Sequence, residues 1–305
     1  MSELFFFRNS KSTCAGYPGT FSFNGSVDYT EVDAMTFSDW GVDSLKLDGC
    51  NANHPYKDTY QAYSRALGKQ KHKIVFGCSW PLFDQHHAGD EMYKILHEHC
   101  HLWRNYNDIE DSWRSVKGII EFYRMNVHHF LKWHGPGSFF DPDMLIIGND
   151  GLSYEQSKSQ MAFWCLWSAP LLMSNDLRDI KPEFKAILQN KHLIAVNQDP
   201  LAVMGHVVVH EGNKQMWVKK LSPAVAGGLN SYAVLYFNDD IIGPPAVMSH
   251  QLSKLIPELK AGHKYDVHDL FDDHAKLETL TPEQSLTLRV PISGSVRMVK
   301  LVPHN

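Results

Sequence analysis

The sequence lacks several features that would assign it to a class of proteins other than globular enzymes or binding modules. Its 305 residues contain no run near the roughly 18 consecutive apolar residues of a membrane-spanning helix, so no membrane span is expected. It has no basic block, and 29 Lys and Arg against 34 Asp and Glu give a net charge of −5, which argues against nucleic-acid binding. No CxxC pair is present, which argues against a structural zinc ribbon.

The amino-terminal residues also lack a secretory signal peptide, because Phe5-Phe6-Phe7 is too short an apolar segment and no basic segment precedes it. The cysteine content nevertheless resembles that of a secreted protein, since an odd number of cysteines leaves one over after two disulfides. Cys165, within the apolar run Phe163–Trp167, is expected to be that buried, unpaired thiol. Asn24 begins the N-glycosylation triplet Asn24-Gly25-Ser26, which fits the same compartment.

The first 200 residues alternate between strand-like apolar runs and helix-like amphipathic segments. This alternation is typical of βα units around a parallel sheet. The expected strands are 44–48, 73–77, 102–104, 143–147 and 170–173, with a short one at 4–7; the expected helices lie near 30–40, 57–69, 90–99, 111–131, 154–167 and 181–190.

Polar residues follow the ends of these predicted strands. Polar residues come just after five of the apolar runs: Asp48, Ser79, Arg104 with Asp108, Asn149 and Asn175. In a (β/α)₈ barrel the active site is built from the carboxyl ends of the strands. A single polar residue there would more simply begin a turn, but several in register favour a functional site.

The pattern changes after Asn197-Gln198-Asp199-Pro200. Short β-rich stretches follow, separated by Gly, Pro, Asn and Asp turns, without a long amphipathic helix. We therefore predict residues 1–200 to form a partial (β/α) barrel of the TIM type, with its amino-terminal strands missing, and residues 201–305 to form an antiparallel β-sandwich. The expected strands of the sandwich are 207–210, 215–219, 232–237, 246–252, 264–269, 285–290 and 296–301.

Asp48 and Asp108 are candidates for a catalytic pair. Asp48 follows a strand that carries Lys46, and a nearby cation favours an ionised carboxylate suited to nucleophilic attack. Two carboxylates on different strand ends can face one substrate, as in retaining glycoside hydrolysis. The alternative is that an aspartate caps the helix that follows, and Asp111 is the better candidate for that cap.

These residues sit within segments that resemble glycoside hydrolase family 27, the α-galactosidases and α-N-acetylgalactosaminidases. The resemblance runs in order from residue 13 to about 205, whereas the carboxyl-terminal part is similar mainly in architecture. The matching segments are Thr13–Gly19, Asp39–Asp43, Leu45–Cys50, Cys78–Pro81, Trp103–Asp108, Asp141–Leu145, Ala169–Arg178 and Asn197–Leu201.

The resemblance implies roles for individual residues. Asp48 matches the nucleophile and Asp108 the acid/base of a double-displacement mechanism that needs no cofactor and no metal. Lys46 matches a lysine that binds sugar hydroxyls, and Arg104 an arginine near carbon 2 of the sugar. The implied disulfides are Cys14–Cys50 and Cys78–Cys100, which leave Cys165 free. The substrate-binding set is completed by Ser79, Trp80, Leu82, Cys14, Cys50 and Met144.

The loop after Cys78 gives mixed signals about the sugar. Ser79 matches members that accept an acetamido group on carbon 2, whereas the bulk of Leu82 matches galactose-specific members. Phe83 replaces the usual tyrosine. We expect an α-galactosidase with relaxed selectivity that acts on oligosaccharide, glycolipid or glycoprotein substrates.

The same resemblance implies a lysosomal or secreted protein that forms homodimers, and it reveals a departure at the amino terminus. The family's first strands, its signal peptide and its paired sugar-binding aspartates have no counterpart here. Two alternatives to an active glycosidase follow. One is a truncated, catalytically impaired chain that only binds sugar or has no function. The other is a metal-dependent hydrolase built on His97, His99, Cys100 and His101. A histidine-rich helix end is the simpler interpretation of that second cluster.

Overall fold

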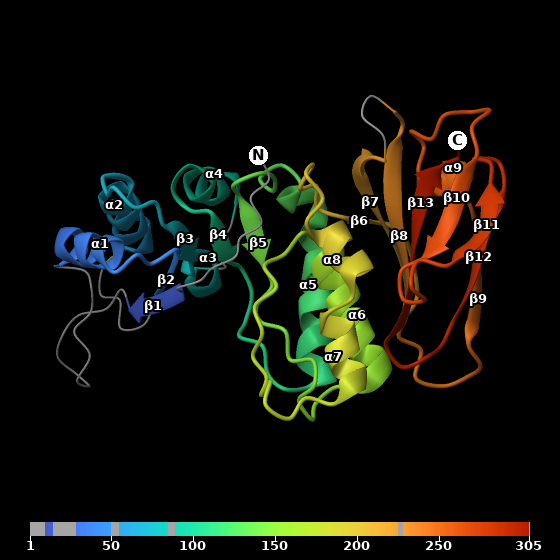
Figure 1. The fold of residues 1–305 in the computed structure, drawn as a ribbon, viewed down its shortest axis with the longest axis horizontal. Coiled ribbons are helices and arrows are strands. Elements are labelled where there is room, and N and C mark those ends of the chain that lie inside the picture. The colour runs from blue at the N-terminus through green and yellow to red at the C-terminus, as the bar shows by residue number, and fades with distance from the viewer. Residues whose placement is uncertain (1–9, 15–28, 50–54, 85–88, 225–227, 305) are drawn as a thin grey trace. The chain divides into compact units, whose positions relative to one another are not determined.

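The computed structural model describes residues 10–14, 29–49, 55–84, 89–224 and 228–304. The chain divides into two compact units. The first comprises residues 1–108 and 136–142, and the second comprises residues 109–135 and 143–305. Figure 1 shows the first unit's helices α1–α4 in blue to teal and the second unit's sheets in orange and red.

The first unit contains a parallel sheet whose five strands pair in sequence order. Helices connect successive strands, as the alternating pattern predicted. The strands are β1 (Ser10–Cys14), β2 (Ser44–Asp48), β3 (Val75–Cys78), β4 (Leu102–Arg104) and β5 (Phe139–Asp141), and the helices are α1 (Thr30–Asp39), α2 (Tyr56–Gly68), α3 (Trp80–Phe83) and α4 (Asp90–His99).

One face of this sheet is covered by α2 and α4. The ring of Tyr63 on α2 stacks on Phe76 of β3, and that of Tyr93 on α4 contacts Phe140 of β5. Thr59, Tyr60, Tyr63, Ala66 and Leu67 are the buried positions of α2, at helical spacing. Burying each large side chain stabilises the fold by about 1.5–3 kcal/mol.

The register of the strands places the candidate residues at one edge. Cys14 pairs with Asp48, and Arg104 pairs with Asp141. Leu47 pairs with Cys78, so Ser79 follows at the level of Asp48. Because side chains alternate along a strand, Lys46 and Asp48 face away from the buried Leu45 and Leu47. The carboxyl ends of the strands therefore bring these polar groups together.

The second unit begins with helices that have clear sequence signals at their starts. Ser112 caps α5 by accepting a hydrogen bond from the amide of Ser115, and Ser153 and Gln156 form a capping box on α6. Pro182 occupies the first turn of α7, where its missing N–H costs nothing. The helices are α5 (Trp113–Phe130), α6 (Tyr154–Leu166), α7 (Pro182–Leu188) and α8 (Lys191–Asn197).

The rest of the second unit is antiparallel. Six strands form one sheet and two form another, and both contribute to one hydrophobic core that includes Val234, Met248 and Leu286. A short helix, α9 (Leu252–Leu255), follows β9. The strands are β6 (His206–Glu211), β7 (Lys214–Pro223), β8 (Asn230–Asn238), β9 (Ala246–Gln251), β10 (Tyr265–Asp269), β11 (Lys276–Leu280), β12 (Ser285–Val290) and β13 (Ser295–Pro303).

A buried lysine joins β7 to the ends of two helices. The ammonium group of Lys219 donates to the carbonyl oxygens of Cys165 (3.1 Å) and Val196 (2.7 Å) and to the hydroxyl of Ser168 (2.6 Å). These acceptors match the three donors of an ammonium group. Burial lowers the pKa of Lys219 to about 7.

The structure corrects several predicted elements. Residues 143–147 and 170–173 are not strands, and only Leu145 and Met173 form a bridge. The amide of Ile146 binds the side chain of Gln160, which takes it out of strand pairing. The strand lies earlier, at β5, and the sequence analysis did not predict β1, α3, α8, α9 or β11. The stub at 4–7 lies outside the described residues.

The architecture agrees with prediction at a coarser level. A parallel sheet with connecting helices precedes antiparallel sheets. Five strands pair in the parallel sheet within the described part of the chain, so closure into an eight-stranded barrel remains a prediction. The predicted boundary near residue 200 also remains a prediction, although secondary structure changes from helix to strand between Asn197 and His206.

Candidate active site

Asp48 ends β2 with its carboxylate partly exposed. One oxygen accepts a hydrogen bond of 2.7 Å from the amide of Gly49, and the other lies 3.8 Å from the ammonium group of Lys46. The side chains of Lys46 and Asp48 are 39% and 37% exposed, so both can meet a ligand from solvent. This arrangement suits an ionised carboxylate beside a hydrogen-bond donor for hydroxyl groups.

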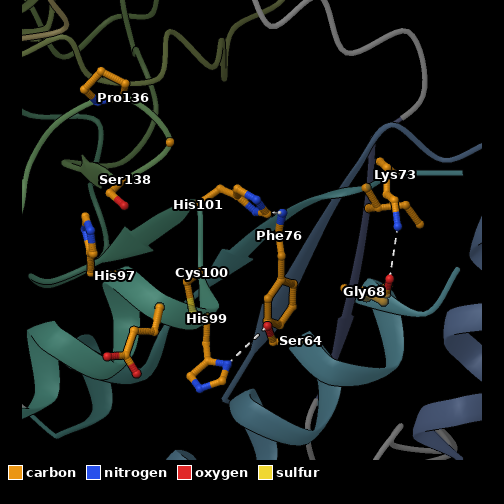
Figure 2. Close-up of a pocket in the computed structure, with 14 residues that line it drawn as sticks. Ser64, Gly68, Lys73, Phe76, His97, His99, Cys100, His101, Pro136 and Ser138 are labelled. Carbon is orange, nitrogen blue, oxygen red and sulfur yellow. Dashed lines mark hydrogen bonds between the residues drawn. The ribbon is translucent and has the colours of Figure 1, made fainter.

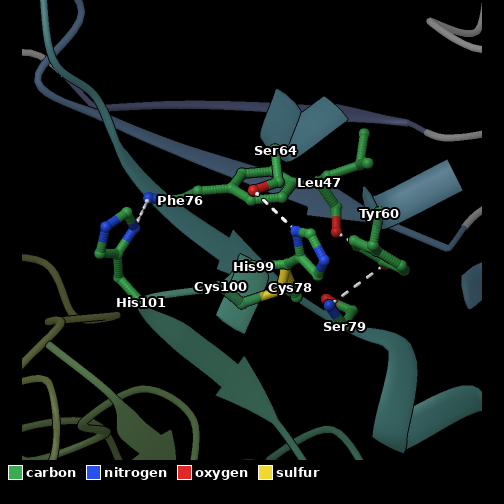
Figure 3. Close-up of a disulfide and its surroundings, with 9 residues drawn as sticks. All are labelled: Leu47, Tyr60, Ser64, Phe76, Cys78, Ser79, His99, Cys100 and His101. Atoms are coloured by element: carbon green, nitrogen blue, oxygen red, sulfur yellow. Dashed lines mark hydrogen bonds between the residues drawn. A yellow bond between two sulfur atoms is a disulfide. The ribbon is translucent and has the colours of Figure 1, made fainter. Parts of the chain in front are cut away.

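Tyr60 links this strand end to the next one. Its hydroxyl donates to the carbonyl oxygen of Leu47 over 2.9 Å and accepts from the amide of Ser79 over 3.1 Å. Figure 3 shows Tyr60 between these two residues, near the disulfide. Burial raises the pKa of the Tyr60 phenol, so it stays protonated and able to donate. Tyr60 was not predicted from the sequence as a site residue, because nothing in the helical pattern of α2 distinguishes it from its buried neighbours.

The loop after β3 begins with buried residues and becomes exposed. Ser79 is fully buried, and its hydroxyl has no hydrogen-bond partner among the described residues. Trp80 is also buried, and its indole N–H donates to Asp84 over 3.3 Å. Leu82 is half-buried, and Phe83 is exposed. The ring of Phe83 lies so close to Gly49 that a side chain at residue 49 would require this ring to move.

Arg104 and Asp108 form an ion pair that starts at the end of β4. The Nη2 atom of Arg104 lies 3.0 Å from a carboxylate oxygen of Asp108 and 3.1 Å from the carbonyl oxygen of Tyr106. The side chain of Arg104 is 4% exposed, whereas that of Asp108 is 82% exposed. A buried cation therefore holds the base of a loop that presents a carboxylate to solvent.

The segment that carries Met144 belongs to the second unit. Met144 is half-buried, and its amide donates to its neighbour Asp143 over 2.9 Å. The amide of Ile109 donates to the other carboxylate oxygen of Asp143, also over 2.9 Å. Nothing in the sequence distinguishes Asp143 as a functional residue, although it lies inside a matching segment and directly follows Pro142.

The helix cap predicted at Asp111 is wrong. Ser112 caps α5, and Asp111 instead accepts a hydrogen bond of 3.1 Å from the amide of Gly151. The freedom of Asp108 from a capping role does not depend on this point, because Asp108 binds Arg104.

The structure contains the Cys78–Cys100 disulfide that the resemblance implied, with the two Cα atoms 6.1 Å apart. Cys165 is a buried free cysteine, as expected. Cys50, the side chain of Cys14, and Asn24 lie outside the described residues, so the second disulfide and the glycosylation site stay predictions.

A cavity of about 580 Å³ lies in the first unit at the opposite edge of the sheet. It opens among the residues that precede β3, β4 and β5, and Figure 2 shows His97, His99, His101 and Ser138 around it. The ring of His101 accepts a hydrogen bond from the amide of Phe76 over 2.9 Å, and burial lowers its pKa. No cluster with the makings of a metal site occurs among the residues that the structure describes. The cavity lies where the strands begin, whereas Asp48 and Arg104 lie where their strands end, so it is separate from the candidate catalytic groups.

A comparison with models of known protein families assigns most of the chain to one family. Residues 5–199 match the family described as alpha galactosidase A (Melibiase_2). The chain belongs to this family, glycoside hydrolase family 27. Asp48, Ser79, Arg104, Asp108 and Met144 all lie within the matched region.

Individual family members agree with this assignment. The chain is 43% identical to α-N-acetylgalactosaminidase of Gallus gallus over 261 residues, which cover 85% of this chain and 61% of that protein. It is also 43% identical to human α-galactosidase A over 235 residues, covering 76% of this chain and 52% of that protein. The chain thus spans between one half and two thirds of the length of these relatives.

A solved structure supports the fold. The crystal structure of α-galactosidase I from Mortierella vinacea superimposes with a TM-score of 0.81, covering 96% of this chain and 76% of that one, at 24% sequence identity. Within the described residues, no helix of this chain has the length and apolar character to cross a membrane.

Proposed function

We propose that the chain is a retaining glycosidase that removes terminal α-linked galactose from glycoconjugates. The observation that carries this proposal is the common edge of the parallel sheet, from which both Asp48 and the Arg104–Asp108 pair extend. Membership in the alpha galactosidase A family supports it, and relatives in that family bear the names α-galactosidase and α-N-acetylgalactosaminidase.

The proposed reaction is a double displacement. A carboxylate oxygen of Asp48 attacks the anomeric carbon while the glycosidic C–O bond breaks, and Asp108 transfers its proton to the leaving oxygen. Water then attacks the same carbon and releases Asp48, and Asp108 takes a proton from that water. Every atom that takes part in these two steps comes from the two carboxyl groups, the substrate or water. The proposed reaction therefore requires no metal or cofactor.

Lys46 and Arg104 would bind the sugar. The Lys46 ammonium group is partly exposed beside Asp48 and can donate to ring hydroxyls. Arg104 is buried and would act near carbon 2 from below the loop that carries Asp108. The resemblance to the family also implies substrate contacts for Cys14, Cys50 and Met144, and Trp80 could stack on the sugar.

The preferred sugar depends on the loop after β3. Leu82 is half-buried and bulky, which would crowd an acetamido group and favour galactose. Ser79 belongs to the acetamido-accepting type, although its hydroxyl is buried. We propose α-galactosidase activity with measurable activity on α-N-acetylgalactosaminides.

Hydrolysis of a matched pair of aryl substrates tests the function directly. The purified 305-residue chain should release the aryl group from an α-galactoside, and more slowly from the α-N-acetylgalactosaminide. Asp48→Asn should lower kcat by at least about 100-fold, because it removes the nucleophile. If folded protein is inactive on both substrates, the chain is instead a sugar-binding or non-functional member of the family.

The cellular location and assembly are further parts of the proposal. Disulfide-bonded cysteines support a lysosomal or secreted protein. The homodimer implied by the family can be tested by sedimentation, and glycosylation at Asn24 by a mass shift after deglycosylation.

A further inference from the structure

We infer that Asp143 is the positioning residue that holds the loop carrying Asp108. Both oxygens of its carboxylate are occupied by backbone amides. One oxygen accepts from Ile109, the residue bonded directly to Asp108, and the other accepts from Met144. Fixing the amide of Ile109 restrains the peptide group that it shares with Asp108. This inference rests on the proposed function, because it assigns Asp143 to the acid/base of that mechanism.

The carboxylate is required because of what it faces. Two N–H donors approach it at 2.9 Å each, and an ionised carboxylate is an acceptor at both oxygens. An amide of the same shape has one acceptor and one donor, so it would oppose an N–H group with its own NH₂. Asp143 is buried, so water cannot easily replace a lost contact.

The backbone of Asp143 is held in an unfavourable conformation. Its φ of 81° lies in the left-handed region, which costs energy for a residue other than glycine. Such conformations persist where surrounding contacts determine them, and they concentrate at functional sites. Here α6 contacts the segment that holds this conformation.

Two fully buried side chains of α6 provide those contacts. The indole N–H of Trp164 donates to the carbonyl oxygen of Asp143 over 2.7 Å. The side-chain amide of Gln160 donates to the carbonyl oxygen of Met144 and accepts from the amide of Ile146. The segment that carries Asp143 is therefore attached to a buried helix and not to a mobile loop.

The loop itself is anchored again beyond Ile109. Asp111 accepts from the amide of Gly151, and the amide of Glu110 donates to the hydroxyl of Ser115. The ion pair between Arg104 and Asp108 restrains the loop before Ile109. Asp143 thus supplies the first restraint on the carboxyl-terminal side of Asp108.

The test uses two substrates that differ in their need for acid assistance. An aryl α-galactoside with a strongly acidic leaving group departs without a proton, whereas an alkyl α-galactoside needs one from Asp108. Asp143→Asn should lower kcat for the alkyl substrate about 10- to 100-fold more than for the activated aryl substrate. A general folding defect would lower both rates by the same factor.

The matched control is Asp150→Asn, the same chemical change at an exposed residue in the following loop. It should leave both rates and their ratio unchanged. Asp143→Glu keeps two acceptors and should restore part of the lost ratio. An unchanged ratio in Asp143→Asn, with both rates lowered equally, would overturn the inference.

Hydrogen exchange at the Ile109 amide separates this inference from the proposed function. Exchange should become at least about 10-fold faster in Asp143→Asn than in wild type or Asp150→Asn, because the bond that protects the amide is lost. If the wild-type chain hydrolyses neither substrate, the proposed function fails, and the role in acid catalysis fails with it. If the enzyme is active but exchange at Ile109 is unchanged in Asp143→Asn, only the positioning role of Asp143 would be overturned.

Discussion

The guanidinium group of Arg104 lies 3.0 Å from a carboxylate oxygen of Asp108, and it joins the most buried charge of the candidate site to the most exposed one. Arg104 is also within hydrogen-bond distance of the carbonyl oxygen of Tyr106, so one nitrogen fixes two points of the same loop. A planar, permanently charged group suits this task, because a flexible ammonium group would lose more freedom on making the same contacts.

Replacing Arg104 with lysine should therefore impair activity more than it impairs folding. Arg104→Lys keeps the positive charge but loses the planar arrangement of donors, and we expect kcat/KM on an aryl α-galactoside to fall about 10-fold or more. The free energy of unfolding should fall by about 1–3 kcal/mol. Arg124→Lys makes the same change in the ion pair with Glu121 on α5 and should leave kcat/KM unchanged. Equal activities in the two variants would contradict this role for Arg104.

Removing the hydroxyl of Tyr60 should weaken both the fold and the site. Tyr60→Phe leaves the carbonyl oxygen of Leu47 and the amide of Ser79 without their shared partner in a buried position. We expect a loss of about 1–3 kcal/mol in the free energy of unfolding, measured by urea titration. The control is Tyr63→Phe on the same helix, where the hydroxyl makes a longer contact of 3.5 Å with Asp33. The prediction fails if Tyr63→Phe is as destabilising as Tyr60→Phe.

The sequence predicted correctly the helices and strands that are marked by their own spacing of apolar residues. The bounds of α4, β4 and β12 match the predicted ranges, because each is delimited by its own apolar spacing. The strand predicted at 143–147 is wrong, since Pro142 and the left-handed φ of Asp143 end β5 at Asp141 and α6 side chains take the following backbone groups.

In the candidate site, too, features set by nearby residues could be predicted, whereas contacts between distant segments could not. The positions of Asp48 and Arg104 at the ends of strands could be predicted, because polar residues after apolar runs mark strand ends. Tyr60 and Asp143 could not, because their roles depend on which backbone groups a distant segment brings within hydrogen-bond distance. Such contacts are set by tertiary packing and have no period in the sequence.

The Cys78–Cys100 disulfide should contribute measurably to stability. It closes a loop with a sequence separation of 22 residues, which corresponds to about 3 kcal/mol of unfolded-state entropy. The double variant Cys78→Ala/Cys100→Ala should lose about that much in urea unfolding without reductant. Cys165→Ala is the matched control, because burial raises the pKa of that thiol to about 12 and it forms no bridge. A control variant that is destabilised as strongly would show that the crosslink itself contributes little.

Three histidine rings stack in the second unit, with His274 in the middle. The ring of His274 lies 4.2 Å from that of His268 and 5.0 Å from that of His192, nearly parallel to both. Burial lowers the pKa of His274 to about 4, from an ordinary value of 6.5. Charges on His268, His192 and Lys300 add to the decrease in pKa, and Asp273 opposes it.

The lowered pKa predicts a loss of stability in acid. Between pH 6.5 and about pH 4 the unfolded chain binds a proton at His274 that the native protein does not, so the free energy of unfolding falls as the pH falls through this window. His274→Asn removes the group and suits the φ of 62° at this position, so the difference in Tm between pH 7 and pH 4.5 should shrink. His263→Asn changes an exposed histidine outside the stack and should leave that difference as in wild type. If both variants behave alike, the stack has no part in the acid response.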